Sequence, residues 1–305
     1  MRQPRLWMGL CFLLVSSHAV SAQLQIVLSD DSAPYQEVFE TIRARFDDRE
    51  VTVGRINADA VTEAALNARL VVVVGVRAAE SVANISGKVP VLAVLVPKDW
   101  YRKSGRLRMQ GNDHRPASAI FLDQPFERQA QLVRLAFPEA KRIGVLIGAA
   151  QAGLIEELET ALRSQRLSLV HEVLAADQKL IEPLERIFSA ADLLLAVPDP
   201  EVFNRNTAQS VFLTSYRYRD PVVGYSRSLG RAGAMVSLYS TPAQIGRQAA
   251  ELIGKLLESS QIHLPNPVYP RYFSVSVNQQ VARSLGFDLP SESELERKLE
   301  GSGND

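Results

Sequence analysis

An uninterrupted run of aliphatic residues, Leu70 to Val74, constrains the fold of this chain more than any other feature of its sequence. A strand without polar alternation is buried on both faces, as in a parallel sheet that helices cover. Similar short apolar runs recur along the chain, and segments with a helical period, such as 35–46, separate them. This alternation of strands and helices predicts an α/β fold with parallel sheets.

The predicted strands fall into two successive series, which indicates two similar Rossmann-like lobes. The first series is 24–28, 51–53, 70–74, 89–96 and 117–122, and the second is 142–147, 167–174, 193–197, 222–225, 234–238 and 272–277. Among the predicted helices, one at 126–137 would have Asp123 as its cap, and one after Thr241 would begin with a capping box. The polar stretch 102–115 interrupts the alternation of predicted strands and helices. We expect a surface excursion there, before the chain first crosses between the lobes.

Residues 1–22 have the pattern of a secretory signal peptide. Arg2 and Arg5 precede the apolar run 6–15, and Ser21 and Ala22 supply small residues for signal peptidase. The run is shorter than the roughly 20 residues that a bilayer core requires, so an N-terminal membrane anchor is the disfavoured alternative. We expect cleavage after Ala22 and a mature protein in the periplasm.

Charge and residue usage exclude several kinds of function. Lys+Arg and Asp+Glu number 34 each, whereas non-specific binding to nucleic acid needs a basic face, so we expect no nucleic-acid partner. The single cysteine lies inside the predicted signal peptide, and the histidines that follow this peptide, His114, His171 and His263, lack the spacing of metal ligands. We therefore expect no metal site and no disulfide in the mature protein.

Signatures of catalysis and of cofactor binding are scarce. No G-x-G-x-x-G or Walker pattern occurs, so no cofactor is expected. The segment Gly224 to Ser228 comes close to the nucleophile elbow G-x-S-x-G, but it lacks the last glycine, and no Asp lies between Ser226 and His263. We expect no catalytic residues and a protein that is not an enzyme, and an esterase centred on Ser226 is a disfavoured alternative.

Residues that follow predicted strands are the candidates for ligand binding, because ligands of open α/β sheets bind beyond the carboxyl ends of the strands. This group combines aromatic rings, hydroxyls and charges, which suits a small polar ligand with an apolar body. Its members are Ser32, Arg77, Trp100, Asp199, Tyr225 and Arg227.

Two of these candidates are predicted to clamp the ligand. We expect Trp100 and Tyr225 to approach an interlobe cleft from opposite sides, while Arg77 or Arg227 binds a carboxylate. The alternative is that strand ends carry ordinary turn residues, which is favoured for Ser32, and that Trp100 covers the stretch 102–115.

Several segments resemble the ABC-transporter substrate-binding family of type I periplasmic binding proteins, which includes tryptophan and tyrosine binders. The segment 137–146, Phe-Pro-Glu-Ala-Lys-Arg-Ile-Gly-Val-Leu, is similar to the start of the second lobe in this family. Further similar segments are 195–200, 221–226, 232–237, 245–250 and 278–290. The resemblance covers roughly residues 110–290 and extends to the first lobe in pattern only, where the loops at 29–39 and before Asn112 depart from the family.

The resemblance implies two lobes joined by three crossovers, with a ligand between them. It implies a first lobe at 23–122 and 237–290 and a second lobe at 123–236, and the charged, Gly/Ser-ended segment 291–305 is expected to be a flexible tail.

The function that follows is the periplasmic solute-binding component of an ABC importer. It would be a monomer that binds a small molecule, such as an aromatic or apolar amino acid, by hinge closure and serves an inner-membrane ABC permease. The departing first-lobe loops keep an alternative open, a periplasmic ligand-sensing or envelope-assembly module that is not coupled to transport.

Overall fold

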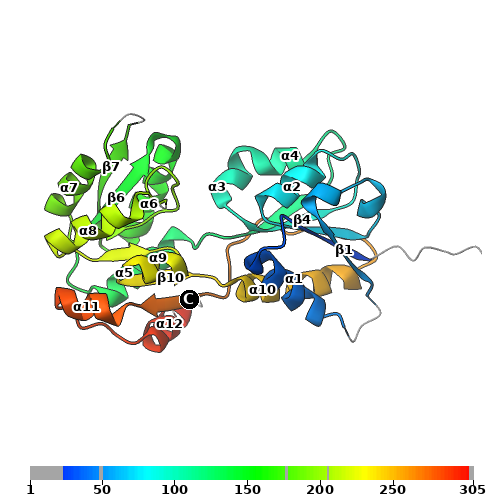
Figure 1. Cartoon of the computed structure of the whole chain (residues 1–305). Coiled ribbons are helices and arrows are strands. Elements are labelled where there is room, and N and C mark those ends of the chain that lie inside the picture. Colours follow the sequence, from blue (N-terminus) through cyan, green and yellow to red (C-terminus); the bar gives the residue numbers. More distant parts are fainter. Residues whose placement is uncertain (1–22, 48–50, 176–177, 205, 302–305) are drawn as a thin grey trace, which may run out of the picture.

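The computed structural model describes residues 23–47, 51–175, 178–204 and 206–301, which form two α/β lobes joined by extended segments (Figure 1). The predicted signal peptide, residues 1–22, lies outside the described residues. Within the described ranges, no helix combines the length and the apolar character that crossing a membrane requires.

The first lobe contains a five-stranded, all-parallel sheet in the order β2-β1-β3-β4-β5. Its strands are β1 (Leu24–Leu28), β2 (Val53–Asn57), β3 (Leu70–Val74), β4 (Val91–Val96) and β5 (Ala117–Phe121). Every residue of β3 is fully buried, in agreement with the unbroken aliphatic run.

Helices cover both faces of this sheet. Figure 1 shows α1 (Ala33–Ala44) and α10 (Pro242–Glu258) on one side, and α2 (Val76–Ala83) and α4 (Arg106–Gln110) on the other. Successive side chains of a strand point to opposite faces of the sheet. Ile26 and Leu28 pack in the core under α1 and α10, whereas Val27 packs on the side of α2. Short 3₁₀ turns lie at Ala58–Ala60 and Ala64–Leu66.

The stretch 102–115 is mostly exposed, as the sequence predicted, but its first part is helical. After α3 (Lys98–Trp100), a π-helical turn at Tyr101–Gly105 continues into α4. The side chains of Tyr101 and Met109 are buried against the sheet, so the apolar residues within a largely polar sequence suffice to fasten these turns to the core.

The second lobe contains a six-stranded sheet in the order β11-β10-β9-β8-β6-β7. Its strands are β6 (Arg142–Gly148), β7 (Ser168–Leu174), β8 (Leu193–Leu195), β9 (Val222–Gly224), β10 (Val236–Tyr239) and β11 (Ser274–Val277). All neighbours pair in parallel except β11, which is antiparallel to β10. The predicted fold class, two α/β lobes with parallel sheets, is confirmed.

The helices of the second lobe also form two layers. One core joins the sheet to α5 (Phe126–Ala136), α6 (Ile155–Ser164), α11 (Gln279–Leu285) and α12 (Glu292–Gly301). The opposite core joins it to α7 (Ile181–Ala190), α8 (Ala208–Tyr218) and α9 (Arg227–Ala232). A 3₁₀ segment at Ala149–Leu154 leads from β6 into α6.

The assignment of residues 237–290 to the first lobe is wrong at both ends, because 237–239 continue β10 of the second sheet and the last part of the range also belongs to the second lobe. Helix α10 does pack along α1, but β11 returns to the second sheet, where Val236 faces Val277 in the register. The reason is that β10 would otherwise leave its outer edge unpaired, and β11 covers this edge.

The expectation of a flexible tail at 291–305 is also wrong for its described part, because residues 292–301 form α12. Leu295 and Leu299 lie one turn apart and are buried in the core of the second lobe. The carboxylates of Glu292 and Glu296 accept hydrogen bonds from the backbone N–H groups of Val277 and Val275, each at 2.8 Å. The helix thus satisfies the edge donors of β11.

The chain passes between the lobes in three described segments, 122–125, 240–241 and 259–273 (Figure 1). The first two are tied together, since the Gln124 side chain donates a hydrogen bond of 2.7 Å to the Ser240 hydroxyl. The third segment runs beside β5, where Val268 forms a parallel bridge with Ile120. These crossovers bring the carboxyl ends of β4 and β5 to face those of β6, β8 and β9.

Candidate functional site

A cavity of about 500 Å³ lies between the lobes, at the carboxyl ends of the central strands. We call it the Trp100 pocket. Its walls are the segments that follow β4, β5, β6, β8 and β9, together with Tyr269 of the third crossover; they comprise Pro97, Lys98, Asp99, Trp100, Lys103, Ser104, Asp123, Gln124, Phe126, Gln129, Gln151, Leu154, Val197, Pro198, Asp199, Pro200, Phe203, Tyr225 and Tyr269. Its place and its volume are typical of small-molecule sites.

A second cavity of about 440 Å³, the Arg227 pocket, adjoins the first at Tyr225. It extends past this ring toward the start of α1, at Pro34 and Glu37, and toward Arg227 and Tyr239 of the second lobe. The interlobe cleft therefore has two parts that share the Tyr225 side chain as a wall.

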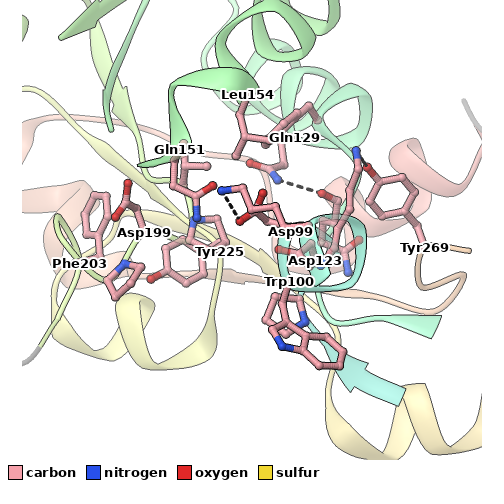
Figure 2. A pocket seen from close by; sticks show the side chains of 18 of the residues that line it. Asp99, Trp100, Asp123, Gln129, Gln151, Leu154, Asp199, Phe203, Tyr225 and Tyr269 are labelled. Carbon is pink, nitrogen blue, oxygen red and sulfur yellow. Dashed lines mark hydrogen bonds and ion pairs between the residues drawn. The ribbon is translucent and has the colours of Figure 1, made fainter. Parts of the chain in front are cut away.

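Five aromatic side chains of the described residues line the Trp100 pocket, those of Trp100, Phe126, Phe203, Tyr225 and Tyr269. Figure 2 shows Tyr225, Phe203 and Asp199 at one side of it and Tyr269 at the other. Phe203 contacts Tyr225 edge to face, with ring centroids 6.1 Å apart. Trp100 packs on Gly105, where an added Cβ would come within 2.4 Å of the indole ring. These rings offer an apolar surface to a ligand body.

Asp199 is held rigidly at this site and is only 2% exposed. Its two carboxylate oxygens accept the backbone N–H groups of Gly148, at 2.7 Å, and Glu201, at 2.9 Å. Burial, with a contribution from the Asp199 charge, raises the pKa of Tyr225. Each carboxylate oxygen can accept a further hydrogen bond, so Asp199 can receive a donor from a ligand.

Asp123 does not cap α5 as predicted, because its carboxylate accepts the backbone N–H of Lys98 at 2.7 Å instead. The N-cap position of α5 belongs to Pro125, two residues later. Burial raises the pKa of Asp123. The carboxylate thus fixes the turn after β4 against the first crossover, beside the pocket.

The cations of the pocket already have partners, and these partners join the lobes. The Lys98 ammonium donates to the Glu157 carboxylate on α6 and to the Tyr269 hydroxyl. Burial acts to lower the pKa of Lys98, but these two hydrogen bonds and the charges of the same partners outweigh it, so the pKa is raised. The Lys103 ammonium lies 2.9 Å from the Asp99 carboxylate and donates to the Ala150 carbonyl oxygen at 2.8 Å.

The structure brings three of the six predicted ligand residues together, since Trp100, Asp199 and Tyr225 all line the Trp100 pocket. Arg227 lines the adjoining pocket, where its Nε donates to the Tyr239 hydroxyl at 3.1 Å.

The other two predicted residues, Ser32 and Arg77, line neither pocket. Ser32 is exposed at the start of α1 and Arg77 is exposed on α2. The side chain and backbone N–H of Ser32, and more weakly the charge of Arg77, lower the pKa of Asp30.

Sequence reasoning missed several lining residues. Gln151 follows β6, so its place after a strand was a usable signal, and its Oε1 is buried without a hydrogen-bond partner in the described part of the chain. Phe203 lies in the turn that Asp199 organises. Tyr269 comes from the third crossover, and no pattern in the sequence marks this residue.

The Ser226 hydroxyl has a structural role. It accepts the backbone N–H of Leu229 at 3.2 Å and so caps α9. Across the described ranges, no three His, Cys, Asp or Glu side chains are grouped to hold a metal ion.

Two α/β lobes with a cleft at the carboxyl ends of their strands define the class of the type I periplasmic binding proteins. Residues 122–295 match the model of the family described as ABC transporter substrate binding protein. The chain belongs to this family, which confirms the resemblance seen in the sequence. Members of the family are binding proteins.

Solved structures with the same fold include substrate-binding proteins. A ligand-free, open substrate-binding protein with adhesive properties from Clostridium difficile has a TM-score of 0.71 and 14% identity, over 88% of this chain and 96% of that one. An ABC domain in complex with L-Trp from Streptococcus pneumonia has a TM-score of 0.60 and 14% identity, over 90% and 98%. A search of curated proteins finds no match.

Proposed function

We propose that the protein is the periplasmic solute-binding component of an ABC importer and that it binds a small molecule between its two lobes. The observation that supports this most is the aromatic Trp100 pocket, which lies at the strand ends of both lobes and is about the size of a small ligand. Membership of the ABC transporter substrate-binding family supports the same conclusion.

In this proposal Trp100 and Tyr225 clamp the apolar body of the ligand, and Asp199 orients its polar end. The moving parts are a first lobe of residues 23–121 with α10 and a second lobe of 126–239 with 274–301. Closure by a hinge at the three crossovers would bury the ligand, and the closed lobes would present a surface to an inner-membrane permease. The signal peptide at 1–22, the periplasmic location and a monomeric state complete the proposal.

A thermal-shift screen with amino acids, nucleosides, amines and small organic acids tests the binding step. A ligand at about 100 times its Kd stabilises the folded state by about 2.7 kcal/mol, which raises Tm by several degrees. The proposal requires at least one such ligand, and it requires that Tyr225→Ala reduce the shift. If no compound of any charge class raises Tm, the protein is not a small-molecule binder of this kind.

Uptake of the identified ligand by cells with and without the gene then separates transport from the alternative, a sensing or envelope-assembly module. Loss of uptake in the deletion strain, restored by the parent gene, supports transport. Binding in vitro with unchanged uptake in the deletion strain would favour the alternative.

A further inference from the structure

The charges around the Trp100 pocket are unbalanced toward the negative. Two ammonium groups and three carboxylates line it, those of Lys98, Lys103, Asp99, Asp123 and Asp199. Lys98 is paired with Glu157, which also lies 3.7 Å from the Arg102 guanidinium, and Lys103 is paired with Asp99. Both cations are thus already neutralised by carboxylates, and neither is free to bind an anionic ligand.

Asp123 and Asp199, by contrast, have no cationic partner. Their carboxylates accept only backbone N–H groups, and among the described residues no Lys, Arg or His nitrogen lies within ion-pair distance of either. The backbone donors orient these two carboxylates without cancelling their charge.

The Glu201 carboxylate adds a further negative charge beside Asp199. A Cβ placed on Gly148 would meet a Glu201 carboxylate oxygen at 2.2 Å and an Asp199 carboxylate oxygen at 3.2 Å, so both carboxylates converge on the end of β6. A ligand carboxylate here would meet like charge in a partly desolvated site, which is unfavourable.

The aromatic side chains of the pocket also favour a positively charged ligand. The face of an aromatic ring attracts an ammonium group, and this attraction grows when the site is shielded from water. Tyr225 and Phe203 stand beside Asp199 (Figure 2). No arginine is among the described residues that line the Trp100 pocket, and Arg227 lines the adjoining pocket, where it donates to Tyr239.

We propose that the ligand of the Trp100 pocket is an amine without a carboxylate, whose ammonium group donates to Asp199 while its apolar body packs on Trp100 and Tyr225. This inference rests on the proposed function and narrows it to a class of ligand. It replaces the sequence-based expectation that Arg77 or Arg227 binds a carboxylate.

Calorimetric titration of the full chain with four compounds that share an indole body tests the proposal. They are tryptamine, a cation; indole-3-ethanol, which is neutral; indole-3-propionate, an anion; and L-tryptophan, a zwitterion. We expect tryptamine to bind about tenfold or more tightly than indole-3-propionate and L-tryptophan, with indole-3-ethanol between them.

Two variants identify the carboxylates responsible. Asp199→Asn should weaken tryptamine about tenfold and indole-3-ethanol much less, because only tryptamine loses the attraction between opposite charges. Because this change also perturbs a backbone anchor, Glu201→Gln provides a second variant at an exposed position, where we expect a loss of about threefold for tryptamine alone. Glu159→Gln, an exposed position on α6, is the control for the loss of one negative charge and should bind tryptamine as the parent does.

Three results would overturn the proposal. These are binding of indole-3-propionate or L-tryptophan as tightly as tryptamine, tryptamine binding that neither variant weakens, and no binding by any of the four compounds. In the first two cases a small molecule still binds, and in the third the proposed function survives if another compound from the thermal-shift screen binds, so the two failures are distinguishable.

Discussion

Asp220 is the described side chain with the largest pKa shift outside the cleft. Burial raises its pKa from the ordinary value of 3.8 to about 6, nearby Asp192 adds to the shift, and Arg142 opposes it. The unfolded chain releases this proton at lower pH than the folded protein does. The carboxyl group therefore costs stability that grows as pH rises from about 4 to 6 and stays constant above.

We expect Asp220→Asn to stabilise the protein at pH 7 and to have little effect at pH 4. Because the group is partly exposed, solvent screening limits the gain to about 1 kcal/mol or less. Thermal unfolding of both proteins at the two pH values measures it. A difference in Tm that is the same at pH 4 and pH 7 would contradict the assigned pKa.

Single residues of the cleft were predictable from sequence only in part. Trp100, Asp199 and Tyr225 follow β4, β8 and β9, whose ends meet in the Trp100 pocket. Ser32 and Arg77 also follow strands, β1 and β3, yet the first-lobe wall of the pocket comes from the segments after β4 and β5. The rule about strand ends does not say which strands border the cleft, because this depends on the strand order.

At the scale of elements, the contact of α1 with α10 depends on one glycine. A Cβ at Gly246 would lie 2.9 Å from Thr41 Cβ and 3.2 Å from the Val38 carbonyl oxygen, so the two helices approach as closely as they do because the side chain is absent. Gly254, two turns later in the same helix, has open space around its would-be Cβ.

These two glycines should respond oppositely to substitution by alanine. Gly254→Ala should raise the free energy of unfolding by about 0.5–1 kcal/mol, because alanine favours helix. Gly246→Ala should lower it despite the same gain in propensity, because the helices must separate. Urea denaturation of both variants measures the difference, and equal stabilisation by the two would refute the close packing of α1 on α10.

Elements were more predictable than residues, and the two failures have physical causes. The strands near 24–28 and 70–74 were found because unbroken apolar runs mark strands that are buried on both faces. Helix α12 was missed because the segment is mostly charged, and only two apolar residues, Leu295 and Leu299, mark the side of the helix that is buried. The return of β11 to the second sheet was missed because hydrophobic pattern does not encode which edge a strand pairs with.

At the scale of the whole molecule, ion pairs at one rim of the cleft connect the lobes. Glu157 of α6 binds the Lys98 ammonium and lies 3.7 Å from the Arg102 guanidinium, both in the first lobe. The pair of Lys98 and Glu157 is largely shielded from solvent, with 17% and 29% of the two side chains exposed. Contacts of this kind bias the equilibrium between lobe orientations.

Glu157→Gln should therefore widen the distribution of interlobe distances in the ligand-free protein. A loss of about 1 kcal/mol changes the ratio of two orientations about fivefold. Distances between spin labels on Leu107→Cys and Leu213→Cys, both highly exposed positions in different lobes, measure the change in the proposed mature protein, which has no cysteine of its own. Glu159→Gln should leave the distribution unchanged, and an unchanged distribution for Glu157→Gln would show that these pairs do not hold the lobes.

The central claim is that a small molecule binds in the Trp100 pocket, and tryptophan fluorescence tests it directly. The sequence has two tryptophans, Trp7 and Trp100, and Trp7 lies in the proposed signal peptide, so in the proposed mature protein the pocket residue is the sole reporter. We predict that the ligand found by thermal shift changes the Trp100 emission saturably, with the Kd that calorimetry gives, and that Tyr225→Ala weakens this binding about threefold to tenfold, as expected for a lost ring contact. A ligand that binds by calorimetry while the Trp100 emission and the effect of Tyr225→Ala both stay absent would contradict the account, because its site would lie elsewhere.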